Sequence, residues 1–362
     1  MKIKRKQRKL TNTWRAIRDV LERRARLLSR PLALHLEIND FCNLKCFMCP
    51  READDIEKDT ANMPLDVVRA VEPLMEQALY VGLVGNGEPF IHPELFDVIE
   101  MIQRHEAVPT LITNGTLLRE KHFDALVGDR PLLLQFSIDG GTKPTFESIR
   151  IRADFDKVVA GMEALVERKR AKGAVYPVLA FIVCLMKENL YELDKIVELG
   201  AKFGVGAINV QKLYPYIDSV KEHCIEDHAE CRRVAAQAQE QARKHGIDLR
   251  FQEMGDSIDV RLAGENGGRP GRFFCEYAWQ KMHIGLKGDA RVCCFWTHGE
   301  LGNVLDTDAA ELWNNEVMVD ARRKILTGDF PPDCAKCHMV CPHRRIPLVK
   351  QTYAQAHDVW KR

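Results

Sequence analysis

Hydrophobic and polar positions along the chain repeat with two different periods. Apolar runs, some alternating with polar residues, predict β-strands at residues 32–38, 79–84, 108–112, 132–138, 176–184, 207–213 and 249–251. Apolar residues three or four positions apart predict helices at residues 64–78, 92–105, 117–127, 155–172, 189–203 and 226–245, with Asn189 as an N-cap. Six consecutive strand–helix repeats predict an α/β fold with a parallel sheet and right-handed crossovers.

Three cysteines follow the first predicted strand, at the edge of the sheet where ligands of such folds bind. Cys42, Cys46 and Cys49 have the spacing C-x3-C-x2-C. This spacing can place three thiolates around one 4Fe–4S cube and leaves one iron without a protein ligand. Zinc ligation by the same residues and burial as free thiols are alternatives that the spacing leaves open.

Glycine-rich and polar loops follow the next three predicted strands. Their sequences are Gly85-Asn86-Gly87-Glu88-Pro89, Thr113-Asn114-Gly115-Thr116 and Ser137-Ile138-Asp139-Gly140. Each alone is typical of an ordinary strand–helix turn. Because the carboxyl ends of neighbouring parallel strands lie together, the three loops and the cysteines are expected to share one site.

In this order, the motifs resemble those of the radical S-adenosylmethionine (radical SAM) superfamily. The resemblance implies a partial (β/α)6 TIM-like barrel. It also implies that the 4Fe–4S cluster at the three cysteines binds SAM through its open iron. One electron, from a flavodoxin- or ferredoxin-type donor, then cleaves SAM to a 5′-deoxyadenosyl radical that abstracts hydrogen from a substrate.

The same resemblance implies which residues contact SAM, namely Gly87, Glu88, Asn114, Ser137, Asp139 and Arg150. Gly87 and Glu88 are expected beside the methionine amino group, and Ser137 and Asp139 beside the ribose hydroxyls. The guanidinium of Arg150 suits the methionine carboxylate, with the nearby Arg152 as an alternative. The residue before the third cysteine, often aromatic in this superfamily, is Met48 here.

A second group of cysteines lies beyond the turn-rich residues 264–271. Its members are Cys275, Cys293, Cys294, Cys334, Cys337 and Cys341. The group resembles SPASM/Twitch domains, which hold auxiliary 4Fe–4S clusters. The resemblance implies one auxiliary cluster, held by Cys275, Cys293, Cys334 and Cys337, with Cys294 and Cys341 as substitutes. A zinc-ribbon-like site at the same four residues is the alternative.

The distribution of charge singles out the N-terminus. Residues 1–30 contain twelve Lys and Arg and two acidic residues, a net charge of +10, whereas the whole chain carries +1. Such a segment can contact anionic membrane or nucleic acid. We favour a solvated tail followed by a helix that packs its apolar side on the barrel, through Trp14, Ile17, Val20, Leu21, Leu27 and Leu28. Nucleic acid is therefore not an expected partner.

Composition bears on compartment and domains. No apolar run reaches the roughly 20 residues of a membrane helix. The chain has twelve cysteines and its N-terminus does not have the pattern of a secretory signal, which favours a reducing, cytoplasmic location. The predicted division is a basic tail and helix (1–30), the radical SAM barrel (31–255), a linker (256–271), the auxiliary cluster domain (272–345) and a C-terminal tail (346–362).

The substrate is less constrained than SAM cleavage. Roughly thirty residues precede the first strand, fewer than the leader-binding domain common in peptide-modifying relatives. This favours oxidation of a small molecule, such as a sugar or aminocyclitol alcohol, with the auxiliary cluster as electron acceptor. An epimerase, a peptide maturase and a non-catalytic iron–sulfur or zinc protein stay open. Cys184 ends the fifth strand, where its thiol suits either hydrogen donation to a substrate radical or simple burial.

Overall fold

A curved, mostly parallel β-sheet organises the chain. The computed structural model describes residues 2–52, 61–214, 218–251, 273–297, 299–335, 337 and 340–342. The sheet has nine strands in the order β10-β9-β1-β2-β3-β4-β5-β6-β7. These are β1 (Ala33–Glu37), β2 (Tyr80–Val84), β3 (Val108–Thr113), β4 (Leu133–Ser137), β5 (Val178–Leu185), β6 (Ala207–Lys212), β7 (Asp248–Phe251), β9 (Lys281–Ile284) and β10 (Ala290–Arg291).

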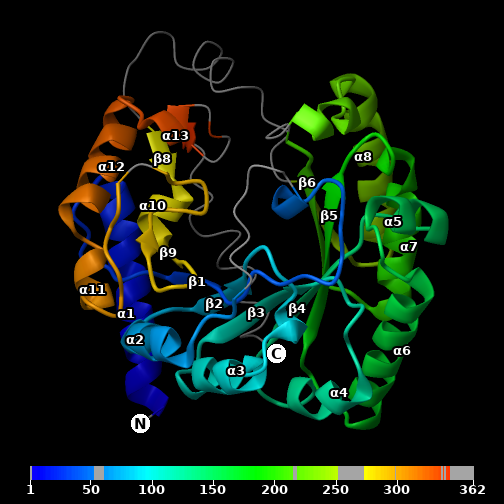
Figure 1. Ribbon diagram of the computed structural model, residues 1–362, viewed down its shortest axis with the longest axis horizontal. Helices are drawn as coiled ribbons and strands as arrows, with labels where there is room; N and C mark the ends of the chain where they lie inside the picture. Colours follow the sequence, from blue (N-terminus) through cyan, green and yellow to red (C-terminus); the bar gives the residue numbers. More distant parts are fainter. Residues whose placement is uncertain are drawn as a thin grey trace.

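Helices cover the outer face of this sheet (Figure 1). The barrel helices are α2 (Leu65–Met75), α3 (Leu95–Arg104), α4 (Glu120–Leu126), α5 (Lys143–Ile149), α6 (Phe155–Ala171), α7 (Leu193–Phe203) and α8 (His228–Lys244). Every predicted strand and barrel helix is present with ends shifted by a few residues, and α5 is an addition. Short 3-10 turns are η1 (Pro50–Glu52), η2 (Pro89–Ile91), η3 (Leu190–Glu192) and η4 (Asp218–His223). The predicted α/β partial barrel is confirmed.

Alternation along the strands decides which side chains face the helices. In β1, Leu34 and Leu36 are fully buried in the apolar core shared with Val67 and Val71 of α2. Successive side chains of a strand point to opposite faces. His35 and Glu37 therefore face the inner, concave side of the sheet, where a barrel of this kind keeps its site.

The C-terminal part of the chain extends the same sheet. β9 pairs with β1 in parallel, with Ala33 opposite Lys281 and His35 opposite His283. The sheet thus crosses the predicted boundary between barrel and auxiliary domain. The remaining elements here are β8 (Phe273–Cys275), β11 (Val340–Pro342), α10 (Glu276–Gln280), α11 (Ala309–Leu312), α12 (Glu316–Thr327) and α13 (Pro332–Ala335). The predicted linker and the C-terminal tail lie outside the described residues.

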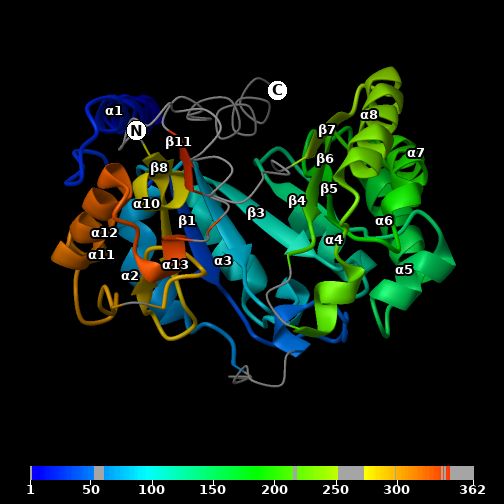
Figure 2. The same cartoon turned by 90° about the horizontal axis from the view of Figure 1, so that it is seen from above.

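The N-terminal helix, α1 (Lys2–Leu21), packs beside these C-terminal elements (Figures 1 and 2). Its predicted apolar side is confirmed only in part. Val20 and Leu27 are buried, whereas Trp14, Leu21 and Leu28 are 66%, 68% and 49% exposed. Beside Val20, the buried side contains residues that were not predicted there, namely Lys9, Asn12, Thr13, Ala16 and Asp19. Polar partners on the neighbouring segments, rather than apolar area, decide how this helix is turned.

Asn189 takes the predicted N-cap position, before η3 and α7, but its side chain is used elsewhere. The Asn189 side chain makes no cap hydrogen bond and is fully buried. Its amide donates to the carbonyls of Asp139 and Cys184 at 2.9 and 2.8 Å, and its Oδ1 accepts from Met186 N at 2.9 Å. Asn189 therefore joins the ends of β4 and β5.

Candidate functional site

Cys42, Cys46 and Cys49 lie in one loop that leaves the carboxyl end of β1. They pack with Leu44 and Met48 in a small apolar cluster apart from the main core. Cys49 N donates to Cys46 O at 3.0 Å, and Leu44 N points at Cys42 Sγ at 3.5 Å. Burial raises the pKa of all three thiols, that of Cys46 to about 11. The loop thus gathers three shielded sulfur donors, the ligands that iron–sulfur clusters use.

Glu88 ties the second strand loop to the third. Its carboxylate accepts hydrogen bonds from Thr113 Oγ1 at 2.6 Å, Asn114 N at 2.7 Å and Phe90 N at 3.3 Å. Glu88 is 2% exposed, and burial raises its pKa to about 7. Both carboxylate oxygens are engaged within the protein, so Glu88 has a positioning role besides its predicted contact with SAM.

Gly87 is required by close packing against the cysteine loop. A Cβ atom there would lie 2.2 Å from Asn39 Oδ1 and 2.6 Å from Phe41 O, inside van der Waals contact. The Asn39 amide in turn donates to Glu88 O at 2.7 Å. This glycine therefore lets two strand loops touch, which is a physical reason for its presence that needs no ligand.

Asn114 links the third strand loop to the cysteine loop. Its Nδ2 donates to Asn43 Oδ1 at 3.0 Å and lies 3.8 Å from Cys42 Sγ. Asn43 Nδ2 donates to Thr116 Oγ1 at 2.8 Å. Asn114 is 6% exposed, and these amides orient the first cysteine from the β3 side.

A buried ion pair lies on the other side of the cysteines. Arg150 Nη2 lies 2.6 Å from Asp139 Oδ2, and Arg150 Nη1 lies 3.9 Å from Cys46 Sγ. Asp139 is 0% exposed, and burial raises its pKa despite the opposing charge of Arg150. Cys184 N donates to the other Asp139 oxygen at 2.7 Å. Arg152, the alternative, is exposed and has a left-handed backbone, φ 74°.

The Nε atom of Arg150 provides a test of whether the site suits SAM. It is buried and has no hydrogen-bond partner within the described residues. Leaving such a donor unsatisfied costs about 1–3 kcal/mol. A carboxylate is the anion that a guanidinium binds with two parallel hydrogen bonds. The open donor beside three thiols therefore fits a ligand that carries a carboxylate and sits on a cluster.

Ser137 is the last residue of β4, and Cys184 is the last but one of the neighbouring strand β5. Ser137 is 8% exposed and pairs in register with Ile182. Cys184 packs against the apolar cluster that contains the three cysteines, and burial raises the pKa of its thiol. Contact of Ser137 with ribose and hydrogen donation by Cys184 stay predictions.

The second cysteine group also comes together. Cys275 ends β8, Cys334 lies in α13, and the two are only 6% and 7% exposed. Cys293 and Cys337 pack against the same apolar core. Burial raises the pKa of Cys275, and the charges of the other three thiols add to this rise. Burial raises the pKa of Cys293 and Cys334 to about 12. The four predicted ligands thus lie in or against one apolar core, and their joint binding of an auxiliary cluster stays a prediction.

The two substitute residues are placed differently. Cys294 is exposed as a residue. Partial burial of its thiol raises the pKa to about 11, and the charges of Glu37 and Cys337 contribute to this rise. Cys341 lies in β11 opposite Phe274, and its side chain lies outside the described residues. Among the described residues, no three His, Cys, Asp or Glu side chains converge on a single metal ion.

A polar wall on the concave face was missed by sequence reasoning. His283 Nε2 lies 2.8 Å from Glu37 Oε1, and Lys281 Nζ lies 2.8 Å from Glu276 Oε1. Lys281 also lies 4.5 Å from the centre of the Tyr277 ring. The polar residues His35 and Glu37, which alternate with leucines in β1, were the only sign of this wall in the sequence. Their partners lie in β9, and the pairing of β9 with β1 was not predicted.

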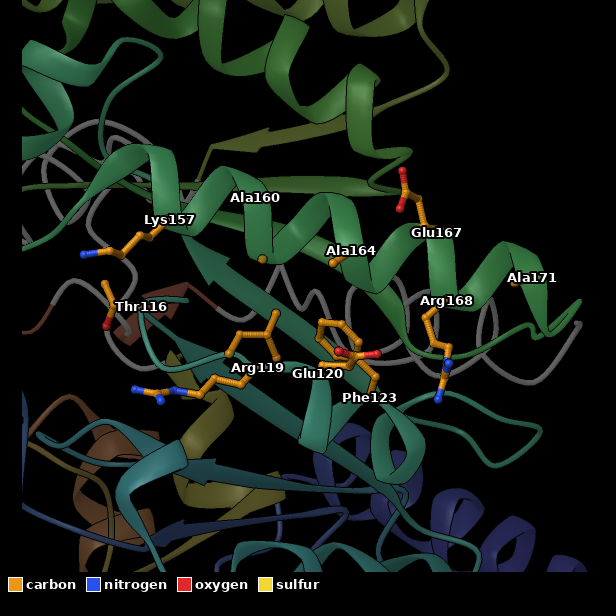
Figure 3. A pocket seen from close by; sticks show the side chains of 12 residues that line it. Thr116, Arg119, Glu120, Phe123, Lys157, Ala160, Ala164, Glu167, Arg168 and Ala171 are labelled. Carbon is orange, nitrogen blue, oxygen red and sulfur yellow. The ribbon is translucent and has the colours of Figure 1, made fainter.

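A groove on the outer helical layer is separate from these residues. It has a volume of about 780 Å³ and lies between α4 and α6 (Figure 3). Ala160, Ala164 and Ala171 of α6 line it, with Phe123 of α4 opposite. One end reaches Thr116, which contacts the cysteine loop through Asn43. The groove itself contains none of the candidate site residues.

Two family models match the chain. The model of the radical SAM superfamily matches residues 36–200, which include the first cysteine group and the three strand loops that follow it. The model of the SPASM iron–sulfur cluster-binding domain matches residues 275–338, which include the second group up to Cys337.

Individual proteins resemble the chain over different lengths. The chain is 29% identical, over 192 residues, to the tungsten-containing aldehyde ferredoxin oxidoreductase cofactor-modifying protein of Pyrococcus furiosus, covering 50% of this chain and 51% of that protein. It is 25% identical, over 324 residues, to PqqA peptide cyclase of Gluconobacter oxydans, covering 86% of this chain and 84% of that protein. The chain spans about half the length of the first curated relatives it matches.

A solved structure shares the fold. Streptococcus suis SuiB bound to S-adenosylmethionine superposes with a TM-score of 0.66 at 16% identity, covering 84% of this chain and 70% of that one. At this identity the likeness bears on the fold alone.

Proposed function

The chain belongs to the radical SAM superfamily and carries a SPASM iron–sulfur cluster-binding domain, and from this premise we propose that it is a maturase that oxidatively modifies a peptide. This replaces oxidation of a small molecule as the favoured reaction. The main support is the similarity to PqqA peptide cyclase, which extends over 86% of this chain.

Exposed apolar side chains around the cysteine loops also support a peptide. Phe41 precedes Cys42, Phe295 follows Cys294, and both are exposed, by 37% and 53%. Ile151 is 41% exposed, and its carbonyl accepts from Lys45 N of the cysteine loop at 3.0 Å. Exposed apolar groups around a site suit a peptide, whose side chains can be large and apolar.

The family implies SAM, a SAM-binding 4Fe–4S cluster and auxiliary cluster chemistry, and the residues present fit these groups. When bound, the clusters would supply the electron that cleaves SAM to a 5′-deoxyadenosyl radical and an acceptor for an electron removed from the substrate. Cys42, Cys46 and Cys49 would hold the first cluster, and Cys275, Cys293, Cys334 and Cys337 the second. A single auxiliary cluster and a flavodoxin- or ferredoxin-type donor stay predictions.

The protein's own residues orient the cofactor end of the site. Asp139 forms an ion pair with Nη2 of Arg150. The Nε–H group of Arg150 is then available to donate to the carboxylate of SAM. Asn114 orients the loop that carries Cys42, and Glu88 joins the β2 and β3 loops behind it. Each contact removes a degree of freedom before SAM binds, which lowers the entropic cost of binding.

Glu37 is the proton acceptor that we assign to the substrate end. His283 Nε2 lies within hydrogen-bond distance of Oε1, at 2.8 Å. Oε2 lies 4.0 Å from Arg291 Nη1, which is beyond hydrogen-bond distance. Burial pushes the pKa of Glu37 upward, but the hydrogen bond from His283 and the charge of Arg291 outweigh it and leave the pKa below its ordinary value. Glu37 is therefore ionised at neutral pH and can take a proton at Oε2 when a peptide loses hydrogen.

Anaerobic incubation tests this proposal. Reconstituted protein is mixed with SAM, dithionite and either a peptide library or a panel of sugars and aminocyclitols, and the products are analysed by mass spectrometry. We expect 5′-deoxyadenosine and a peptide that has lost two hydrogen atoms. Cys42→Ala abolishes both products, whereas Cys231→Ala, a buried cysteine of α8 outside both groups, retains them. Oxidation of an alcohol with every peptide unchanged would restore the small-molecule reaction.

A further inference from the structure

The outer side of α1 carries an exposed apolar row. Leu10, Trp14, Ile17 and Leu21 follow one another at intervals of four, three and four residues, which places them on one side of a helix. Leu10, Trp14 and Leu21 are 52%, 66% and 68% exposed. Three large apolar side chains aligned in solvent are unusual for a helix that packs on a barrel.

Polar contacts prevent this row from turning inward. Lys9 on the opposite side is 1% exposed, and its Nζ donates to the carbonyls of Met75 and Ala78. Asp19 is 0% exposed and accepts from Ser29 N at 2.8 Å and Ser29 Oγ at 2.7 Å. Rotating α1 to bury Trp14 would break these buried hydrogen bonds, so the exposed row is a property of the folded chain.

Basic side chains flank the apolar row. Arg8, Arg15 and Arg18 of α1 are exposed, and residues 1–30 carry a net charge of +10. Arg8 pairs with Glu76 and Arg18 with Glu22, both at the surface, so lipid phosphates would compete with these carboxylates. An apolar row with a basic flank is the pattern of helices that lie in the plane of a membrane surface. A second copy of the chain is a poor partner, because two segments of this charge repel each other.

We propose that α1 binds the surface of an anionic lipid bilayer, with Leu10, Trp14 and Leu21 at the level of the headgroups and the arginines against lipid phosphates. In the part of the chain that the structure describes, no helix has the length and apolar character of a membrane span. Juxtamembrane basic residues are attracted to anionic leaflets, and this attraction weakens with salt. The proposal does not depend on the substrate of the enzyme.

Vesicle sedimentation with the full-length protein tests the proposal. Vesicles contain phosphatidylcholine alone or mixed with phosphatidylglycerol in equal parts. We expect binding to the mixed vesicles, weakening as salt rises, and little binding to phosphatidylcholine alone. Leu10→Ser/Trp14→Ser/Leu21→Ser and Arg15→Glu each lower this binding roughly tenfold or more. The emission of the five tryptophans shifts to shorter wavelength on binding as the Trp14 indole leaves water, and this shift is absent from the triple variant.

Matched controls separate membrane contact from damage to the fold. Tyr191→Ser removes an aromatic side chain that is 64% exposed on η3, far from α1 in sequence, and is expected to bind vesicles like the wild type. The α1 variants keep the wild-type melting temperature and SAM cleavage. Wild-type vesicle binding by the triple variant would overturn the proposal. So would preferential binding of duplex DNA, or a dimer that the triple variant dissolves.

Discussion

Replacing Arg150 tests the electrostatic centre of the proposed SAM site. Arg150→Met leaves the fully buried Asp139 carboxylate without its cation. Removing one partner of a buried ion pair costs about 3–5 kcal/mol of unfolding free energy. Since burial already raises the pKa of Asp139, the stranded carboxylate binds a proton more readily in the folded than in the unfolded state. The variant therefore recovers stability as pH falls.

The double variant Arg150→Met/Asp139→Asn separates stability from binding. It has no stranded charge, and the oxygen of the substituted amide can still accept the hydrogen bond that Cys184 N donates to this position. We expect its stability to return close to that of the wild type. SAM affinity stays low in both variants, because a charge-assisted hydrogen bond worth about 1.5–3 kcal/mol is missing, a loss of roughly 10- to 150-fold in Kd.

Two measurements on each variant decide the outcome. Denaturant unfolding of the iron-free protein gives stability, and anaerobic equilibrium dialysis of SAM with reconstituted protein gives affinity at a known iron content. Arg152→Met, at an exposed neighbouring arginine, is the matched control and keeps wild-type affinity. The reasoning is refuted if the double variant is stable, holds iron and binds SAM like the wild type. Loss of affinity only in Arg152→Met would move the carboxylate contact to Arg152.

Three other outcomes follow from contacts in the site. Gly87→Ala brings a Cβ against Asn39. We expect this variant to lose about 1–3 kcal/mol of stability and to bind less iron on reconstitution. Gly206→Ala is the control, because its Cβ would lie in open space, and it should lose neither. The pKa of Glu88 is raised to about 7, so near neutral pH the folded state binds more protons than the unfolded state. The free energy of unfolding of the iron-free protein should therefore fall as pH rises from about 4.5 to 7. Denaturant titrations of Glu88→Gln should show a smaller fall. Glu37→Gln should still release 5′-deoxyadenosine but form less oxidised product, and equal product yields would remove Glu37 as proton acceptor.

Local patterns predicted the parts of the site that each strand carries by itself. The alternation in β1 and the loop that follows it place Cys42, Cys46 and Cys49 at a strand end without any long-range information. The loops after β2, β3 and β4 are positioned by the same rule, since parallel strands end at one edge. Their convergence was therefore predictable from the order of elements alone.

Features that depend on distant partners were not predictable. The polar wall needs β9 beside β1, and that pairing joins Ala33 near the start of the chain to Lys281 in its last third. The orientation of α1 follows from carbonyls of Met75 and Ala78 that hold Lys9, which the apolar pattern cannot reveal. Asn189 was read as a helix cap because Asn favours that position, but two strand ends use its amide instead.

Iron content and SAM cleavage, measured together, test the central claim that two cysteine groups hold separate clusters and that the first acts on SAM. Anaerobically reconstituted wild type should contain about eight irons, four per cluster, and release 5′-deoxyadenosine under dithionite. The variant Cys42→Ala/Cys46→Ala/Cys49→Ala should keep about four irons, at Cys275, Cys293, Cys334 and Cys337, and leave SAM intact. Zinc in place of iron at both groups, with SAM intact in the wild type, would contradict the account.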